Sequence, residues 1–143
     1  MDYDILVRAG ILRKRDCNVS RIRSLISFAE KNVKMVKTIP LTEDTATIIF
    51  REIYESIRQL GEASWWLKGY EPSNHEISLD GLKDWDIKEK VKLNFLSRFK
   101  KIRHDANYEG MKVSLSQAKE IIEFWDSCCC DIIGQILNKV NSR

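Results

Sequence analysis

The fold of this chain is decided by residues 114–140, SLSQAKEIIEFWDSCCCDIIGQILNKV. Apolar side chains recur there in steps of three and four residues, the spacing that places side chains on one face of an α-helix. The stripe consists of Ala118, Ile121, Ile122, Trp125, Cys129, Ile132, Ile133, Ile136 and Val140. Ser114 precedes Gln117 by three residues, as in a capping box that starts a helix. These residues therefore predict a long helix in the core.

Three other segments show the same periodicity, and two prolines separate them. The predicted helices run from a Ser20 cap to the residues before Pro40, from near Thr42 to Gly69 with Pro72 beyond, and over about 87–108 with a break at Gly110. Their apolar stripes are Ile22, Leu25, Ile26, Ala29, Val33 and Val36; Ala46, Ile49, Phe50, Ile53, Ile57, Leu60, Ala63 and Leu67; and Val91, Phe95, Phe99, Ile102 and Ala106. Four long helices thus account for most of the chain.

The remaining sequence contains no segment with convincing strand alternation, no internal repeat and no low-complexity tract. A length of 143 residues suits a single domain, 1–143. We therefore predict the all-α class, with four long helices in an antiparallel, up-and-down bundle. Short extra helices are expected around residues 78–82 and near the N-terminus, where Leu6, Ile11 and Leu12 would pack across one end.

Composition limits the location and partners of the protein. The net charge of +3 is too small for the whole surface to bind nucleic acid, so anion affinity requires a local cluster. No stretch reaches the roughly 18–20 apolar residues of a membrane span, and the acidic start MDYDILVRAG lacks the apolar region of a signal peptide. We expect a cytoplasmic protein that does not bind membranes. Cys17 lies far from the Cys128–Cys130 run, which favours reduced thiols.

Candidate chemistry concentrates in residues 98–110, RFKKIRHDANYEG. Guanidinium holds phosphoryl oxygens through paired donors and imidazole exchanges a proton near neutral pH, so this set suits nucleotide binding or RNA cleavage without a metal. Surface ion pairs and a polar helix histidine are the structural alternative. Between residues 88 and 104 the only acid is Glu89, against Lys88, Lys90, Lys92, Arg98, Lys100, Lys101 and Arg103. A solvated face usually mixes signs, so this imbalance counts against the alternative.

Other chemically suggestive residues have structural interpretations that we prefer. His75, in a predicted connection, could be catalytic or metal-binding, but a structural or helix-capping role explains it as well. Consecutive helical residues point in different directions, so the Cys128–Cys130 run cannot bind one ion, and two of its members are expected to act as small hydrophobes. Trp65, Trp66 and Trp85 could anchor an interface, and we favour core positions for them.

A family resemblance rests on several segments in order. They are KGYEP at residues 68–72, His75, Arg103-His104, NYEG at residues 107–110 and Val113-Ser114. With the order of the helices, these segments make nearly the whole chain resemble the HEPN domain, named for higher eukaryotes and prokaryotes nucleotide-binding. Its members are small, often dimeric helical bundles whose signature is an arginine followed, after four to six residues, by a histidine. Arg98 and His104 have five residues between them.

The resemblance implies a metal-independent endoribonuclease that needs no cofactor. Many such members are toxins of toxin-antitoxin pairs, and their usual partner is a minimal nucleotidyltransferase. The implied reaction is attack of an RNA 2′-hydroxyl on its own phosphodiester, with His104 as general acid or base and Arg98 stabilising charge on the phosphoryl oxygens. The residues expected to bind phosphate or nucleotide are Lys100, Arg103, Asn107 and Tyr108.

The chain departs from this family pattern at one position. Some active members carry a tyrosine two residues after the histidine, where the nucleotidyltransferase modifies it, but this chain has Ala106 there. Tyr108 follows His104 by four residues and lies on the same helical face. Control through modification of that tyrosine is therefore not expected.

Helix geometry raises the question of which arginine acts with the histidine. At roughly 100° per residue, Arg98 and His104 lie about 120° apart around an ideal helix. Arg103, Lys100 and Asn107 project nearer to His104, so Arg103 is the closer phosphate ligand unless the helix bends or a two-fold partner completes the site. We predict a homodimer with a composite cleft.

Three classes of function remain open at this point. The first is a toxin-type ribonuclease, the second a non-catalytic nucleotide- or RNA-binding module using the same basic face, and the third an interaction protein that holds a nucleotidyltransferase. Replacing His104 by alanine would abolish cleavage but spare binding in the first class and weaken binding modestly in the second. In the third class the substitution would leave partner affinity unchanged.

Overall fold

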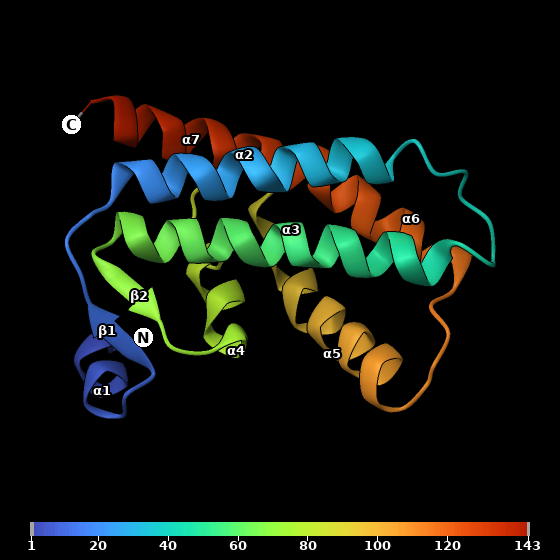
Figure 1. Ribbon diagram of the computed structural model, residues 1–143, viewed down its shortest axis with the longest axis horizontal. Coiled ribbons are helices and arrows are strands. Elements are labelled where there is room, and N and C mark those ends of the chain that lie inside the picture. Colours follow the sequence, from blue (N-terminus) through green and yellow to red (C-terminus); the bar gives the residue numbers. More distant parts are fainter. Residues whose placement is uncertain (1, 143) are drawn as a thin grey trace.

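The computed structural model describes residues 2–142 (Figure 1). The chain is mostly helical, as expected, with several long helices and a small two-stranded antiparallel sheet. The helices are α1 (Tyr3–Arg8), α2 (Val19–Val36), α3 (Ala46–Leu67), α4 (His75–Ser78), α5 (Phe95–Tyr108), α6 (Leu115–Phe124) and α7 (Cys130–Asn141), and the strands are β1 (Leu12–Lys14) and β2 (Tyr70–Pro72). A π-helical turn spans Trp125–Cys129, and 3₁₀ turns span Leu79–Leu82 and Lys90–Asn94.

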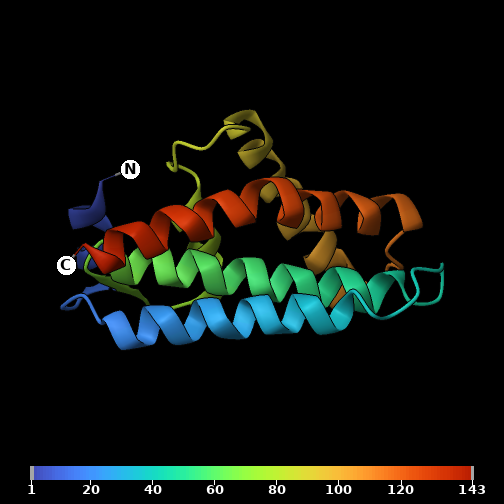
Figure 2. The ribbon, with the colours of Figure 1, turned by 90° about the horizontal axis from the view of Figure 1, so that it is seen from above.

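Helix α3 lies at the centre of the molecule and contacts α2, α4, α5, α6 and α7. Figure 2 shows α2 and the continuous α6–α7 rod running along opposite sides of α3. In Figure 1, α4 and α5 lie on the side of α3 away from α2. Within residues 2–142, no helix combines the length and the apolar character needed to cross a bilayer.

The predicted apolar stripe of α3 is confirmed as core. Phe50, Ile53 and Leu60 are fully buried. Trp65 and Trp66 are buried as well, as is Trp85, so the tryptophans occupy the core positions that we favoured. Buried tryptophans usually find a partner for the indole N–H, and Trp65 Nε1 donates to the Ile77 carbonyl oxygen at 2.8 Å. That bond attaches the segment containing α4 to α3.

Helix α5 is anchored by one phenylalanine. The Phe99 ring lies edge-on between the rings of Phe50 and Phe124, with centroid distances of 6.0 and 5.3 Å. Edge-to-face pairs of this kind stabilise packing beyond the area they bury. Because Phe99 faces the core, residues on the opposite side of α5, such as Lys101, are directed outward.

The segment 114–140 forms one helical rod, as predicted, interrupted by the π turn. Ser114 Oγ accepts from the Gln117 N–H at 3.1 Å and Gln117 Oε1 accepts from the Ser114 N–H at 3.0 Å, which confirms the capping box. Within the π turn, Cys128 and Cys129 are both fully buried, whereas Cys130 is exposed. Burial raises the pKa of the Cys128 and Cys129 thiols, so these residues behave as small hydrophobes.

The expectation of no strands is wrong. β1 pairs with β2 in antiparallel register, with Leu12 opposite Pro72 and Lys14 opposite Tyr70. Each strand has only three residues, so neither produces a recognisable alternation. The sheet stands beside α1, which forms the expected short helix at one end of the molecule (Figure 1).

Three predicted details of the helices also differ from the structure. Asn18, not Ser20, caps α2, because Asn18 Oδ1 accepts from the Arg21 N–H at 3.0 Å. Helix α3 begins at Ala46, after a hydrogen-bonded turn over residues 42–45. Val91 is 78% exposed because residues 90–94 form a 3₁₀ turn with a different angular step, and Leu93 is buried instead.

Candidate functional site

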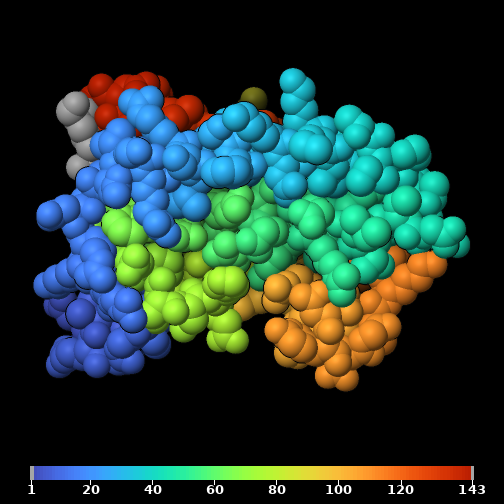
Figure 3. Space-filling view, in the orientation of Figure 1, coloured from blue at the N-terminus to red at the C-terminus, as the bar shows by residue number. Residues whose placement is uncertain are grey.

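A groove opens between α3, α4 and α5. Figure 3 shows it as the notch between the yellow-green segment around α4 and the orange α5. Its volume is about 460 Å³. The lining residues are Tyr54 and Arg58 of α3, His75 and Glu76 of α4, and Ser97, Lys100, Lys101, Arg103, His104 and Tyr108 of α5. Three helices therefore bring charged and hydrogen-bonding side chains to one space.

His104 lies on the α5 wall of this groove and is exposed. Its ring lies against that of Tyr108, with centroids 4.9 Å apart and planes tilted by 47°. Tyr108 is 68% exposed. Among residues 2–142, neither ring nitrogen of His104 has a hydrogen-bond partner, so both are available to a ligand in the groove. The pair thus combines a proton-exchanging group with a flat aromatic surface.

The two arginines of α5 have different surroundings. Arg98 forms an ion pair with Glu120 of α6, and its guanidinium carbon lies 4.7 Å from the centroid of the Phe95 ring. It does not line the groove. Arg103 lines the groove with His104, and within residues 2–142 it forms no ion pair. The structure therefore brings Arg103, and not Arg98, to the histidine.

Tyr54 lies beneath Arg103 on the α3 side of the groove. The Arg103 guanidinium carbon is 5.7 Å from the centroid of the Tyr54 ring. Burial raises the pKa of Tyr54 to about 12, while the charge of Arg103 opposes that rise. The phenol is consequently neutral at physiological pH, and its O–H is a hydrogen-bond donor suited to an anionic oxygen.

The other cations of the groove differ in how far carboxylates neutralise them. Arg58 is held by Glu55 at 2.6 Å and by Glu62 at 3.4 Å. Lys101 pairs with Asp105 at 2.9 Å. Lys100 donates instead to a neutral acceptor, the Glu76 backbone carbonyl, at 3.0 Å. Within the described residues, Lys100 and Arg103 therefore keep their full positive charge for a ligand.

The sequence did not predict the positions of two residues, Asn107 and His75. Asn107 lines an adjoining hollow with Arg51 and Glu52, and Arg103 and Tyr108 form the ridge between that hollow and the groove. His75, for which a structural role was preferred, lines the groove on the α4 wall. No signal in the local sequence places His75 in this groove, since its position depends on how α4 packs against α3.

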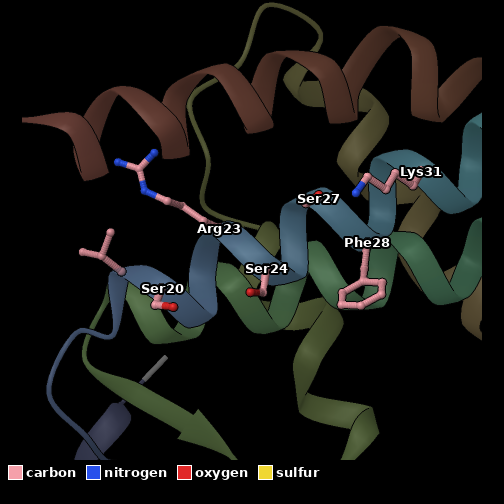
Figure 4. Close-up of a pocket in the computed structure, with 7 residues that line it drawn as sticks. Ser20, Arg23, Ser24, Ser27, Phe28 and Lys31 are labelled. Carbon is pink, nitrogen blue, oxygen red and sulfur yellow. The ribbon is translucent and has the colours of Figure 1, made fainter.

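A second hollow, of about 560 Å³, lies along the outer face of α2 (Figure 4). The described residues that line it all belong to that helix, and they include Ser20, Ser24 and Phe28. Arg23 at one end donates to Asn141 Oδ1 at 2.7 Å. Because no other element contributes, this surface has no convergent chemistry.

No set of three His, Cys, Asp or Glu side chains in the described part of the chain is placed to share a metal ion. Comparisons of the chain with protein-family models, with curated proteins and with solved structures found no match in any of the three. The arguments about function therefore depend on the groove between α3, α4 and α5.

Proposed function

We propose that this protein is a HEPN-type, metal-independent endoribonuclease whose site is the groove between α3, α4 and α5. In this proposal α2, α3, α5 and the α6–α7 rod are the four long helices of an antiparallel, up-and-down bundle. One observation carries the proposal: His104 shares a groove with Lys100 and Arg103, and no carboxylate pairs with either cation within residues 2–142. An imidazole beside unneutralised cations suits a phosphodiester substrate.

The proposed reaction is internal transphosphorylation of RNA. The 2′-oxygen forms a bond to phosphorus while the bond between phosphorus and the 5′-oxygen breaks, which leaves a 2′,3′-cyclic phosphate and a 5′-hydroxyl. The 2′-hydroxyl loses one proton and the departing 5′-oxygen gains one. His104 mediates one of these transfers, and Arg103 and Lys100 stabilise the charge that develops on the non-bridging oxygens.

The remaining groove residues have roles in binding. The neutral Tyr54 hydroxyl would donate to a phosphoryl oxygen, and the exposed Tyr108 ring would stack on a base. Asn107, in the adjoining hollow, would contact a neighbouring nucleotide. Arg98, which the family signature favours, would instead join α5 to α6 through Glu120. The geometry supports Arg103 over Arg98 as the arginine that contacts phosphate.

The proposal includes the partners that the family resemblance implies. These are a second copy of the chain and a minimal nucleotidyltransferase acting as antitoxin. The buried tryptophans leave such interfaces to other residues, and α2 presents exposed Phe28 and Met35. Sedimentation of the purified chain at micromolar concentration is expected to give a dimer, and a monomer alone would argue against the composite cleft.

A non-catalytic RNA- or nucleotide-binding module is the second candidate. The observation in its favour is the contact between the rings of His104 and Tyr108, since aromatic rings flanked by cations bind bases and phosphates without any chemistry. Under this candidate, His104→Ala weakens binding modestly, and combined loss of Arg103 and Lys100 removes it.

The experiment that tests the proposed function compares the purified protein with His104→Ala. Both are incubated with total RNA and with tRNA in excess chelator, and the new ends are analysed. We expect cleavage by the parent protein only, with cyclic-phosphate ends. Lys34→Ala is a control variant, because Lys34 is exposed on α2, away from the groove. Absence of cleavage by the folded parent protein would leave the binding module as the better explanation.

A further inference from the structure

Both histidines of this chain line the same groove. His104 lies on the α5 wall and His75 on the α4 wall, although 28 residues separate them in the sequence. Both side chains are exposed, and within residues 2–142 neither imidazole donates or accepts a hydrogen bond. The proposed function uses His104 for one proton transfer and leaves the second transfer without a group.

The position of His75 is fixed by close packing of α4 on α3. A Cβ added at Gly61 would lie 2.0 Å from the Ser78 carbonyl oxygen, so the backbones of the two helices touch where only glycine fits. Ser64 Oγ donates to the Gly81 carbonyl oxygen at 2.7 Å. Together with the Trp65 bond to Ile77, these contacts hold the α4 segment firmly.

The first turn of α4 is also fixed, and so is the distance between α4 and α5. Asn74 Oδ1 accepts from the Ile77 N–H at 3.1 Å, which caps the helix one residue before His75. Lys100 spans the groove, since its ammonium group donates to the carbonyl of Glu76 at 3.0 Å. The wall that carries His75 is therefore joined to the wall that carries His104 by a direct bond.

We propose that His75 is the second proton-transfer residue of this groove, so that His75 and His104 act as an acid and base pair on one phosphodiester. This inference rests on the proposed ribonuclease function. One imidazole accepts the proton from the 2′-hydroxyl, and the other, protonated, gives its proton to the 5′-oxygen as the bond from phosphorus breaks. Two groups on facing walls suit the reaction because the attacking and departing oxygens lie on opposite sides of phosphorus.

The charges around the pair fit an RNA strand between the walls. From α3 the groove receives the Tyr54 hydroxyl and Arg58, and from α5 it receives Lys100, Lys101, Arg103 and Tyr108. Among the described residues that line it, Glu76 of α4 is the only one with a carboxylate. The phosphate would lie nearest the α5 cations, with a histidine on either side.

The test uses two substrates that differ in the leaving group. The first is an RNA dinucleotide, whose 5′-oxygen requires a proton to depart. The second is a uridine 3′-phosphate ester of p-nitrophenol, whose p-nitrophenolate leaving group departs without a proton. His75→Ala and His104→Ala are each expected to slow dinucleotide cleavage by about 10²–10⁴-fold, the usual size of a general acid or base contribution. The nitrophenyl ester is expected to restore one variant to within about tenfold of the parent, and not the other.

A binding measurement separates chemistry from positioning. Affinity for an uncleavable RNA with 2′-deoxy substitution at the scissile position is expected to change by less than about threefold in either variant, because imidazole contributes chiefly to proton transfer. His75→Gln, which keeps a polar side chain but cannot exchange a proton near neutral pH, is expected to behave as His75→Ala.

Each outcome decides between the two proposals. Parent-like dinucleotide cleavage by His75→Ala would overturn the role of His75 while leaving the ribonuclease intact. Slow cleavage of both substrates by both variants, or full rescue by His75→Gln, would reduce His75 to a positioning residue and overturn the pair. No cleavage of either substrate by the parent protein would overturn the proposed function and the pair together.

Discussion

The two sides of α5 differ in how their charges are used. On the side facing α6, Arg98 is paired with Glu120. On the side facing α3 and α4, Arg103 and Lys100 have no carboxylate partner within the described residues. His104 and Tyr108 lie on this same side. Both sides belong to one helix, and each carries an arginine. Charge compensation by neighbouring helices, and not residue type, therefore decides which cation is available to a ligand.

The largest expected effect comes from breaking the wall opposite α5. Gly61→Ala forces a methyl group against the Ser78 carbonyl, so α4 must shift away from α3. We expect the free energy of unfolding in urea to fall by about 3 kcal/mol, the upper end for overpacking. Gly134→Ala is the matched control: this α7 glycine has open space around it, and alanine should stabilise the helix by about 0.5–1 kcal/mol. Equal stability of the two variants would contradict the close contact.

Long-range packing of this kind also explains what the sequence could and could not predict. The long helices and the buried tryptophans were predictable, because helical periodicity extends over many residues and averages out local exceptions. The strands were not, since a three-residue strand exists only through a partner far along the chain, as Arg13 opposite Glu71, 58 residues later, illustrates. The place of His75 in the groove was not predictable for a similar reason: it depends on Gly61 contacting Ser78.

The site on α5 was predictable in part. Angular spacing around an ideal helix places Arg103 nearer to His104 than Arg98, and the groove contains the first and not the second. The spacing could not identify Glu120 as the partner of Arg98, because Glu120 belongs to another helix and its contact requires the tertiary fold. Nor could it predict that Tyr54 of α3 would lie beneath Arg103.

The second prediction concerns RNA affinity on the groove side. Arg103→Ala is expected to weaken binding of an uncleavable RNA about tenfold, or about 1.4 kcal/mol, because an unpaired guanidinium at a phosphate is lost. The slope of log affinity against log salt should decrease by roughly 1. Fluorescence anisotropy over a salt series measures both quantities. Lys34→Ala removes the same charge from exposed α2 and should change neither, and an equal effect of both variants would indicate non-specific attraction.

A third prediction uses the titration of Tyr54. Its pKa in the folded protein is raised to about 12 by burial, above the ordinary tyrosine value of about 10. The stability linked to this group is therefore complete below pH 10 and is lost as pH rises towards 12. Between pH 9 and pH 11 the parent should lose roughly 1 kcal/mol more unfolding free energy than Tyr54→Phe, which has no phenol to ionise. Parallel urea titrations of the two proteins measure the difference. Identical losses of unfolding free energy would show that the pKa of Tyr54 is not raised in the folded protein.

The smallest expected effect is on the side of α5 that faces α6, where Arg98 is paired with Glu120. It tests the comparison between the two sides of α5 most directly. Arg98→Ala removes an ion pair whose members are both partly exposed, so the unfolding free energy should fall by less than about 1 kcal/mol. Because Arg98 does not line the groove, its loss should leave RNA affinity and cleavage within about twofold of the parent, whereas Arg103→Ala reduces both. Assays of affinity, cleavage and urea unfolding on the two variants make the contrast. A folded Arg98→Ala protein that binds RNA normally but cleaves none would show that Arg98, as the sequence spacing suggests, is the catalytic arginine, and not Arg103. Arg98 could then reach the substrate only if the helix rearranged or a second subunit completed the site.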